Sequence, residues 1–451
     1  MSRMNGNLAW LGTVPDHWQV LKLRQILSPF SEKNHPDMPL LSVVREKGVI
    51  VRNIEDKEEN HNYVPDDLSG YKLVRRGQFA VNKMKAWQGS YGVSRYDGIV
   101  SPAYFVFDIR YNMAEDFFDK AIRSKAYVNF FGQASDGIRV GQWDLSMQRM
   151  KEIPFLLPPR TEQDQIVRFL NWKVSEISRL IRVKHRQIEH FNEKLLTITN
   201  DYVTHGINRD RDYVRTNMDW VPEIPCDWAT SRIRNHFEIL KRIAGSEGFD
   251  VFSVTQQGLK VRNTNLYEGQ LAANYSGYQF VNPGEFAMNH MDLLTGGVGI
   301  ADHLGVTSPD YRVFRLFDKE HCYAPYYLKM LQVCYRRHAF YRFGRGAANV
   351  GRWRLPASAF KNFEIPLPPY DEQIEIARMI ESEEQKSEVV IDCLQRQIDV
   401  LKELKNRLIA DVVTGKIDVR DIEIPEYEFT DDESDIIADE DNETEEKNLE
   451  G

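Results

Sequence analysis

Cysteines and long apolar runs are both scarce in this 451-residue chain. Its four cysteines lie far apart, form no Cys-x-x-Cys pair and have no histidine at zinc-finger spacing. Neither a disulfide framework nor a structural metal site is therefore expected. Residues 1–12 contain no apolar run of signal-peptide length, and no segment approaches the roughly 18 apolar residues of a membrane span. These absences predict a cytoplasmic protein that does not associate with a membrane.

Catalytic signatures are missing as well. The chain contains no Asn-Pro-Pro-Phe/Tyr motif for amino-methylation and no Gly-x-x-x-x-Gly-Lys-Ser/Thr loop for a nucleotide. Its 11 histidines include no His-x-x-x-His pair of the kind that holds a metal ion. The sequence thus predicts a noncatalytic protein with no catalytic residues, no metal and no cofactor of its own.

The formal net charge of −9 is unevenly distributed along the chain. Residues 421–451 contain 15 acidic residues and one lysine, so residues 1–420 carry 57 basic and 52 acidic side chains. The body of the protein is therefore mildly basic, which suits a nucleic-acid partner. The acidic tail is expected to be disordered. We favour a solubilising role for it over a specific role such as screening the basic surfaces.

The chain contains the same pattern twice, about 210 residues apart. Each copy opens with a spaced Trp, Pro and Trp, at Trp10, Pro15 and Trp18 and again at Trp220, Pro225 and Trp228. Each copy closes with Leu-Pro-Pro-x-x-Glu-Gln, at residues 157–163 and 367–373. Between these motifs, Gly-Gln-Phe-Ala-Val-Asn-Lys-Met at residues 77–84 corresponds to Gly-Glu-Phe-Ala-Met-Asn-His-Met at residues 284–291. A repeat this long is not a solenoid and predicts two similar domains with pseudo-twofold symmetry.

A long helix is predicted to follow each closing motif. Residues 155–207 and 365–417 align without a gap, and both have apolar residues at alternating spacings of three and four. This seam is typical of a coiled coil and consists of Leu170, Ile177, Ile181, Ile188, Phe191, Leu195, Ile198, Ile380, Ile391, Leu394, Ile398, Leu401 and Leu408. Gly206 and Gly415 mark the ends of the two helices. An intramolecular antiparallel pair is favoured over a homodimeric coiled coil, because it needs only one loop closure.

The two globular domains are predicted to be mixed α/β, of the α+β kind. Short β-rich runs at residues 40–44, 77–82 and 99–107 recur at residues 252–255, 285–289 and 311–317, and helices are expected at residues 116–131 and 325–343. The expected segments are a first domain (1–159), a first long helix (160–208), a second domain (209–369), a second long helix (370–420) and the acidic tail (421–451). Antiparallel pairing then places the domains at opposite ends of the helical pair.

The doubled pattern resembles the specificity (S) subunit of type I restriction-modification systems over residues 1 to about 420. The resemblance rests on the Ile/Val-Pro-x-x-Trp opening and the Pro-Pro-x-x-Glu-Gln closing motif of each copy. The first closing motif, Phe-Leu-Leu-Pro-Pro, lacks the usual Ile-Pro, and the acidic tail lies outside the pattern. The resemblance implies that each domain is a target recognition domain that reads one half of a bipartite double-stranded DNA target.

The same resemblance implies the partners. The two long helices are expected to set the distance between the half-sites and to bind two methyltransferase subunits, with restriction subunits joining through the complex. S-adenosylmethionine is then expected in the methyltransferase partner, and ATP and Mg²⁺ in the restriction partner.

Residues 136–143 and 343–354 are the segments best suited to reading DNA. Both combine glycine with side chains that match base edges and phosphates, and the candidates are Arg139, Gln142, Arg345, Asn349 and Arg352. Lys83, Lys85 and Arg95 form a second basic group suited to phosphates. The competing explanation for each residue is that it satisfies loop carbonyls or forms a solvated surface. Trp143 and Trp353 are expected in the core.

Two functions therefore stay open. The first is a noncatalytic DNA-specificity subunit. The second is a scaffold whose paired domains bind protein partners without reading DNA. The basic balance of residues 1–420 favours the first.

Overall fold

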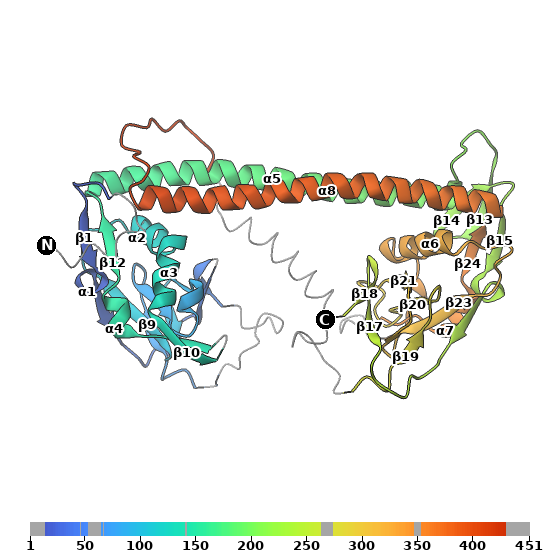
Figure 1. The fold of residues 1–451 in the computed structure, drawn as a ribbon, viewed down its shortest axis with the longest axis horizontal. Coiled ribbons are helices and arrows are strands. Elements are labelled where there is room, and N and C mark those ends of the chain that lie inside the picture. Colours follow the sequence, from blue (N-terminus) through green and yellow to red (C-terminus); the bar gives the residue numbers. More distant parts are fainter. Residues whose placement is uncertain are drawn as a thin grey trace. The chain divides into compact units, whose positions relative to one another are not determined.

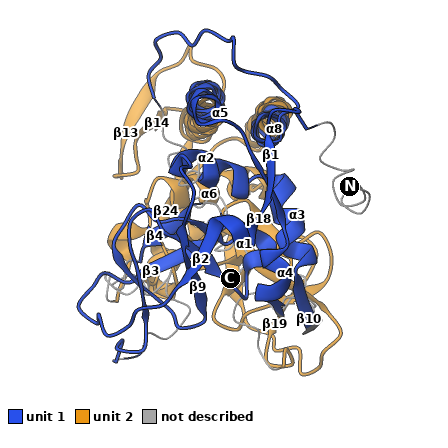
Figure 2. Ribbon diagram, turned by 90° about the vertical axis from the view of Figure 1, so that its left-hand side faces the viewer, with its two compact units in different colours: residues 1–184, 396–438 blue, residues 185–395, 439–451 orange. Residues whose placement is uncertain are grey.

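The computed structural model describes residues 14–45, 47–52, 65, 67–139, 142–262, 274–346 and 353–429. The chain divides into two compact units (Figure 2). Unit 1 comprises the described residues up to Lys184 together with those from Arg396 onwards, and unit 2 comprises His185–Gln395. Each unit therefore contains one globular domain and a part of both long helices.

Unit 1 is built on a four-stranded antiparallel sheet in the order β2-β9-β6-β7, of which β9 is labelled in Figure 1. These strands are β2 (Leu27–Phe30), β9 (Tyr104–Ile109), β6 (Phe79–Asn82) and β7 (Tyr91–Val93). Three antiparallel pairs accompany the sheet: β1 (Gln19–Lys22) with β12 (Pro154–Leu157), β3 (Leu41–Val44) with β4 (Gly48–Val51), and β5 (Lys72–Val74) with β8 (Gly98–Val100). A hairpin of β10 (Ser135–Arg139) and β11 (Gln142–Leu145) follows the helices. The helical segments are α1 (Leu23–Ile26), η1 (Ala86–Gln88), α2 (Glu115–Ile122), α3 (Lys125–Gln133) and α4 (Met147–Lys151).

Unit 2 repeats this architecture. Its main sheet has the order β16-β23-β20-β21, formed by β16 (Phe237–Leu240), β23 (Arg312–Leu316), β20 (Phe286–Met288) and β21 (Val298–Ile300). A second sheet has the order β18-β17-β22-β19, formed by β18 (Gly258–Val261), β17 (Asp250–Thr255), β22 (Gly305–Thr307) and β19 (Gln279–Val281). The remaining strands are β15 (Ala229–Arg232), which pairs with β24 (Glu364–Leu367), and the hairpin β13 (Tyr213–Met218) with β14 (Val221–Pro225). The helical segments are η2 (Ile233–Asn235), α6 (Ala324–Arg336), η3 (Tyr341–Phe343) and α7 (Ala357–Asn362).

Strands β6 and β20 are buried on both faces, which explains why residues 79–81 and 286–288 are apolar without a break. In β6, Phe79 and Val81 pack into the cluster that contains α2 and α3, whereas Ala80 packs on the opposite side with β3 and β8. In β20, Phe286 and Met288 pack toward α6, and Ala287 faces the second cluster. Because successive strand residues point to opposite faces, an apolar run predicts a strand with both faces covered.

The mixed α/β class is confirmed, but one predicted helix is two. The helix expected over residues 116–131 is interrupted, because α2 ends at Ile122 and α3 starts at Lys125. Ser124 takes an extended conformation between them as the N-cap residue of α3. Its backbone carbonyl accepts from the N–H groups of Tyr127 and Val128, and its hydroxyl forms no cap hydrogen bond. The counterpart expected over residues 325–343 ends earlier, at Arg336, and is followed by His338 with a φ of 54° and by η3.

The two long helices are continuous: α5 (Arg160–His205) has 46 residues and α8 (Tyr370–Val413) has 44. In unit 1, Ile166 and Leu170 near the start of α5 share a core cluster with Val412 and Val413 at the end of α8. In unit 2, Val203 near the end of α5 shares a cluster with Ile376, Ala377 and Ile380 near the start of α8. The antiparallel intramolecular pairing is therefore confirmed within each unit. No helix in the described ranges is both long enough and apolar enough to cross a membrane.

The predicted seam residues avoid the exposed faces of both helices. The buried ones are Leu170, Ile177, Ile181, Ile380, Leu394 and Ile398. The half-buried ones are Ile188, Phe191, Leu195, Ile198, Ile391, Leu401 and Leu408. By contrast, Val389 and Val400 of α8, which lie outside the seam, are 70% and 63% exposed. The seam spacing thus separates the covered stripe from the apolar side chains that remain open to solvent.

The repeated Trp and Glu-Gln residues form one anchor in each unit. Trp18 donates its indole N–H to Glu162 Oε1 at 3.0 Å, and Trp228 donates to Glu372 Oε2 at 2.8 Å. In both units the residue after this glutamate is a buried glutamine. Its side-chain oxygen accepts a hydrogen bond from the backbone N–H just before a helix of the domain, from Ala114 before α2 and from Tyr323 before α6. The strand before each anchor has the same kind of partner. β12 pairs antiparallel with β1 in unit 1, and β24 pairs antiparallel with β15 in unit 2. The missing Ile-Pro of the first copy therefore leaves its strand intact.

Glycine is required where each long helix ends. Gly206 and Gly415 have φ values of +73° and +76°. A Cβ atom at Gly206 would collide with Arg211 and Glu372, and one at Gly415 would lie 2.5 Å from Pro15. The glycines both terminate the helices and let the repeated Trp and Pro residues approach.

Replacing Gly206 by alanine should therefore lower the free energy of unfolding by about 1–3 kcal/mol. The cost comes from the left-handed backbone conformation and from the collision of the new Cβ with Arg211 and Glu372. The matched control is Gly132→Ala in α3, where a Cβ meets no atom within 4 Å. That substitution should be neutral or stabilising by up to about 1 kcal/mol. Urea denaturation measures both, and equal effects of the two substitutions would contradict a special role for Gly206.

Candidate nucleic-acid interface

In unit 1 the structure brings two of the predicted basic segments together. The turn that follows β6 lies against the β10–β11 hairpin, and Leu145 donates its backbone N–H to Lys83 O at 2.9 Å. The ammonium group of Lys83 lies 3.1 Å from Asp144 Oδ2 in β11. Lys85, in the same turn, is exposed. The turn and the hairpin therefore form one surface element, which we call the domain 1 reading element (residues 82–87, 135–139 and 142–145).

The hairpin residues predicted to read bases are placed only by their backbone. Arg139 of β10 is the register partner of Gln142 of β11, and the register shifts between Gly137 and Arg139. Their side chains lie outside the described residues. A register shift is typical of a bulge, which redirects side chains near functional sites. Base contacts by Arg139 and Gln142 stay a prediction.

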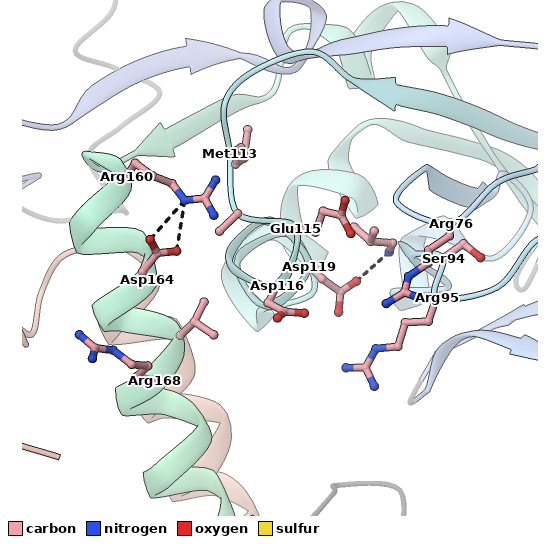
Figure 3. A pocket seen from close by; sticks show the side chains of 13 residues that line it. Arg76, Ser94, Arg95, Met113, Glu115, Asp116, Asp119, Arg160, Asp164 and Arg168 are labelled. Carbon is pink, nitrogen blue, oxygen red and sulfur yellow. Dashed lines mark hydrogen bonds and ion pairs between the residues drawn. The ribbon is translucent and has the colours of Figure 1, made fainter. Parts of the chain in front are cut away.

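Arg95 does not belong to the domain 1 reading element. In the β6–β7 pair, Phe79 is opposite Val93, so Arg95 follows the strand at the Phe79 end, whereas Lys83 follows at the other end. Arg95 instead lines a cleft of about 550 Å³ next to the start of α5. Figure 3 shows Arg160 and Asp164 on one wall of the cleft, Arg76 and Arg95 on the other, and Asp116 and Asp119 between them. Because charges of both signs line the cleft, we assign it no ligand.

Unit 2 has the corresponding arrangement. The turn after β20 is held to the segment before α7, since Leu355 donates to His290 O at 2.9 Å and Leu293 donates to Trp353 O at 3.2 Å. Arg345 and Arg354 form a two-way backbone pair, with N···O distances of 2.8 and 3.1 Å. We call these residues (289–295, 344–346 and 353–355) the domain 2 reading element. Arg345 is exposed, whereas Asn349 and Arg352 lie outside the described residues.

The two tryptophans shared by the reading elements are not equally buried. Trp143 is 37% exposed and lies against Trp87, with ring centroids 5.6 Å apart, so its predicted place in the core is wrong. Trp143 lies nearer the tip of the hairpin than Leu145, which is two residues further along β11, on the same face, and is buried. Trp353 is half-buried, packs against the core and donates its indole N–H to Tyr341 O at 2.6 Å.

The positive charge behind the domain 2 reading element comes partly from residues that sequence analysis missed. Arg312 of β23 is only 5% exposed, donates Nη2 to Leu355 O at 2.8 Å and lies over the Phe360 ring. Burial lowers the pKa of Arg312 to about 10, which still leaves it charged at neutral pH. Burial, with Arg312 and Arg354 nearby, lowers the pKa of His290 to about 4, so His290 is neutral there. The sequence feature that could have identified Arg312 is a charged residue in an otherwise largely apolar strand.

The reading elements of the two domains therefore share a backbone arrangement but differ chemically. Domain 1 presents lysines balanced by Asp144, and domain 2 presents arginines around a neutral histidine. Arginine and lysine next to a turn and hairpin can contact phosphates and base edges, with arginine offering a bidentate fork. The arrangement can thus bind two different stretches of nucleic acid.

Comparison with known proteins points in the same direction. The chain is 20% identical to the putative type I restriction enzyme MjaX specificity subunit of Methanocaldococcus jannaschii, over 91% of this chain and 96% of that protein. No protein-family model matches the chain. A solved structure that concerns complex assembly and conformational transition of the type I R-M system aligns with a TM-score of 0.58 and 14% identity, covering 90% of this chain and 100% of that one. The crystal structure of the HsdS subunit from Thermoanaerobacter tengcongensis aligns with a TM-score of 0.41 and 14% identity, covering 90% and 98% of the two chains.

The relative and the solved structure of higher TM-score both span nearly the whole chain, so the likeness includes both repeats and both long helices. The resemblance to type I restriction-modification specificity subunits that the doubled motif predicts is thereby confirmed.

Proposed function

We propose that this protein is the noncatalytic sequence-specificity subunit of a type I restriction-modification complex. Each domain reads one half of a bipartite DNA target through its reading element. The observation that carries the proposal is the occurrence of one such element per unit, on the same scaffold but with different charged residues. Similarity to a specificity subunit over 91% of the chain supports it.

Different side chains on the two elements mean different half-sites. Lys83 and Lys85 of domain 1 are compact charges that suit phosphate positioning, whereas Arg345 and Arg354 of domain 2 carry forks that suit guanine edges. The target is therefore asymmetric. A scaffold that binds only protein partners is the alternative, and it would show no preference among DNA sequences.

Selection from random double-stranded DNA separates the two functions. The purified chain, assembled with its methyltransferase partner, should enrich one sequence with two short conserved blocks and an unconserved spacer. A scaffold would enrich nothing. Binding should also weaken steeply with salt, because basic residues that contact phosphates release counterions.

We expect the Arg345→Ala variant to relax recognition at the domain 2 half-site and to leave the other half unchanged. Loss of a base-reading arginine costs about 1–3 kcal/mol at one base position. A phosphate contact would instead weaken all sequences equally and flatten the salt dependence. Competition binding with single-base variants of both half-sites measures this. The control is Arg315→Ala, an exposed arginine of the same domain that donates to Glu238 at 2.9 Å and should bind as the wild type does. A change confined to the domain 1 half would contradict the assignment.

The internal repeat also predicts the assembly. Because the chain presents one equivalent surface per repeat, it should bind two methyltransferase subunits, which in turn recruit the restriction subunits. S-adenosylmethionine then belongs to the methyltransferase, and ATP with Mg²⁺ to the restriction subunit. Native mass measurement of the complex should find two methyltransferase subunits per chain. A stable one-to-one complex at saturating partner would disprove the two equivalent surfaces.

A further inference from the structure

Unit 2 contains a cluster of metal-ligating side chains that the domain fold does not require. His236, at the end of η2, and Asp318 and Cys322, in the segment between β23 and α6, bring one ligand atom each within 4.8 Å of one another. His236 Nδ1 lies 2.7 Å from Asp318 Oδ2, and His321 Nδ1 lies 2.9 Å from Asp318 Oδ1. Two imidazoles and one thiol therefore lie around the carboxylate of Asp318, which makes four potential ligands of three chemical kinds.

Three features of the cluster suit zinc. In a tetrahedral zinc site, bonds of about 2.0–2.3 Å separate neighbouring ligand atoms by roughly 3.4–3.8 Å. The two imidazole nitrogens, at 2.7 and 2.9 Å from the carboxylate, would therefore move away from it by about 0.5–1 Å to admit the ion. Thiolate and imidazole ligands select zinc over calcium or magnesium, which prefer oxygen ligands. One thiolate and one carboxylate balance the charge of a divalent ion. The occupied site would therefore carry no net charge, which suits the burial of His236 and Cys322.

The surroundings also support His236 as a ligand. Its other ring nitrogen, Nε2, lies 2.8 Å from the hydroxyl of Ser231, which can accept the N–H and so fix the ring. Metal-binding histidines usually have such a partner on the second nitrogen. His236 and Cys322 are buried, at 6% and 2% exposure, while the His321 side chain remains 67% exposed at the mouth of the cluster. Metal therefore has a path of entry past His321.

The equivalent place in unit 1 shows that the fold forms without these groups. Phe317 donates to His236 O, as Arg110 donates to Ile26 O, so Ile26 occupies the position of His236. Tyr323 donates to Gln373 Oε1, as Ala114 donates to Gln163 Oε1, so Met113 occupies the position of Cys322. Ile26 and Met113 are both buried. Burying polar ligands where the sister domain uses apolar side chains is unfavourable unless they gain partners.

We propose that His236, Asp318, Cys322 and His321 bind one zinc ion that fastens the segment before α6 to η2. Binding displaces the thiol proton of Cys322, and the carboxylate exchanges its hydrogen bonds with the two histidines for a bond to the metal. The same segment is held by Gln373 at the start of α8, which donates to His321 O at 2.7 Å. The ion thus tightens domain 2 next to its long helix, and domain 1 has no counterpart.

Zinc content of the purified full-length chain tests the proposal. After saturation with Zn²⁺ and dialysis against metal-free buffer, the wild type should retain one zinc ion per chain. Co²⁺ in its place should give a sulfur-to-metal charge-transfer band. Cys322→Ser should lose that band and weaken zinc binding on the order of 100-fold or more, and Ser231→Ala should weaken it roughly 10- to 100-fold.

Control variants separate this site from adventitious thiol binding. Cys334→Ser, which alters a buried cysteine outside the cluster, and Cys226→Ser, which alters an exposed one, should keep the zinc. His236→Ile combined with Cys322→Met installs the residues of unit 1 and should give a folded chain that retains no zinc. The proposal is overturned if the wild type retains no zinc, or if retained zinc is unaffected by Cys322→Ser. Loss in Cys226→Ser with retention in Cys322→Ser would place the metal elsewhere and equally overturn it.

Discussion

A chain carrying Gln373→Ala should lose about 3–4 kcal/mol of unfolding free energy. The Gln373 side chain is fully buried. Its amide donates to Pro368 O at 2.8 Å and to His321 O at 2.7 Å, and it accepts from the Tyr323 N–H at 2.8 Å. Alanine removes these bonds and leaves the backbone groups without partners in a place that excludes water. The start of α8 and the segment before α6 are thereby uncoupled.

Gln385→Ala provides the matched control, because Gln385 is an exposed glutamine on the same helix. It should change stability by less than about 0.5 kcal/mol. Gln163→Ala should resemble Gln373→Ala, since the amide of Gln163 donates to Pro158 O at 2.9 Å and accepts from the Ala114 N–H at 2.9 Å. Urea denaturation followed by circular dichroism measures all three. A loss below about 1 kcal/mol for both buried glutamines would show that the repeated motif is not an anchor.

Lengthening both long helices together should lengthen the DNA spacer without changing either half-site. The insertion points are the positions where the two compact units divide the helices, between Lys184 and His185 and between Gln395 and Arg396. Four helix-forming residues at each point add about one turn, or about 6 Å. At about 3.4 Å per base pair, the spacer should grow by one or two base pairs.

Methylation mapping in a host that supplies the methyltransferase reads the half-sites and the spacer together. Insertion into α5 alone is the control, because it shifts one apolar seam past the other and should abolish methylation rather than move the sites. New half-sites at the original spacing after the double insertion would contradict a measuring role for the helices.

The fold was predictable wherever the sequence repeats or has a clear period. The spacing of Leu170, Ile177 and Ile181 predicts the covered stripe of α5, and the β-rich run at residues 77–82 predicts strand β6. The break at Ser124 was missed because the apolar spacing continues across it, from Ile122 to Tyr127. No side-chain cap marks the break, because the Ser124 hydroxyl forms no hydrogen bond to the first turn of α3.

The candidate site was only partly predictable, because its residues come together from distant parts of the chain. Arginine and lysine composition identified Lys83 and Arg345, but the contact between the turn after β6 and the hairpin appears only when the domain is folded. Arg312 lies in a strand that reads as core. His236 and Asp318 are 82 residues apart, so the metal-motif spacings of a sequence search do not find them. The glutamates and glutamines of the closing motifs are recognisable in the sequence as helix starts. The pairing of the two glutamates with Trp18 and Trp228 is not.

Mapping of methylated sites in a host that expresses this chain with its methyltransferase partner tests the central claim most directly. The proposed function predicts a single bipartite motif, made of two unlike half-sites separated by a spacer of fixed length and free sequence. Omitting the chain should remove every one of these methylated sites while the methyltransferase is still produced. Methylation that persists without the chain, or that follows one uninterrupted motif, would contradict the claim that its two domains each read half of the target.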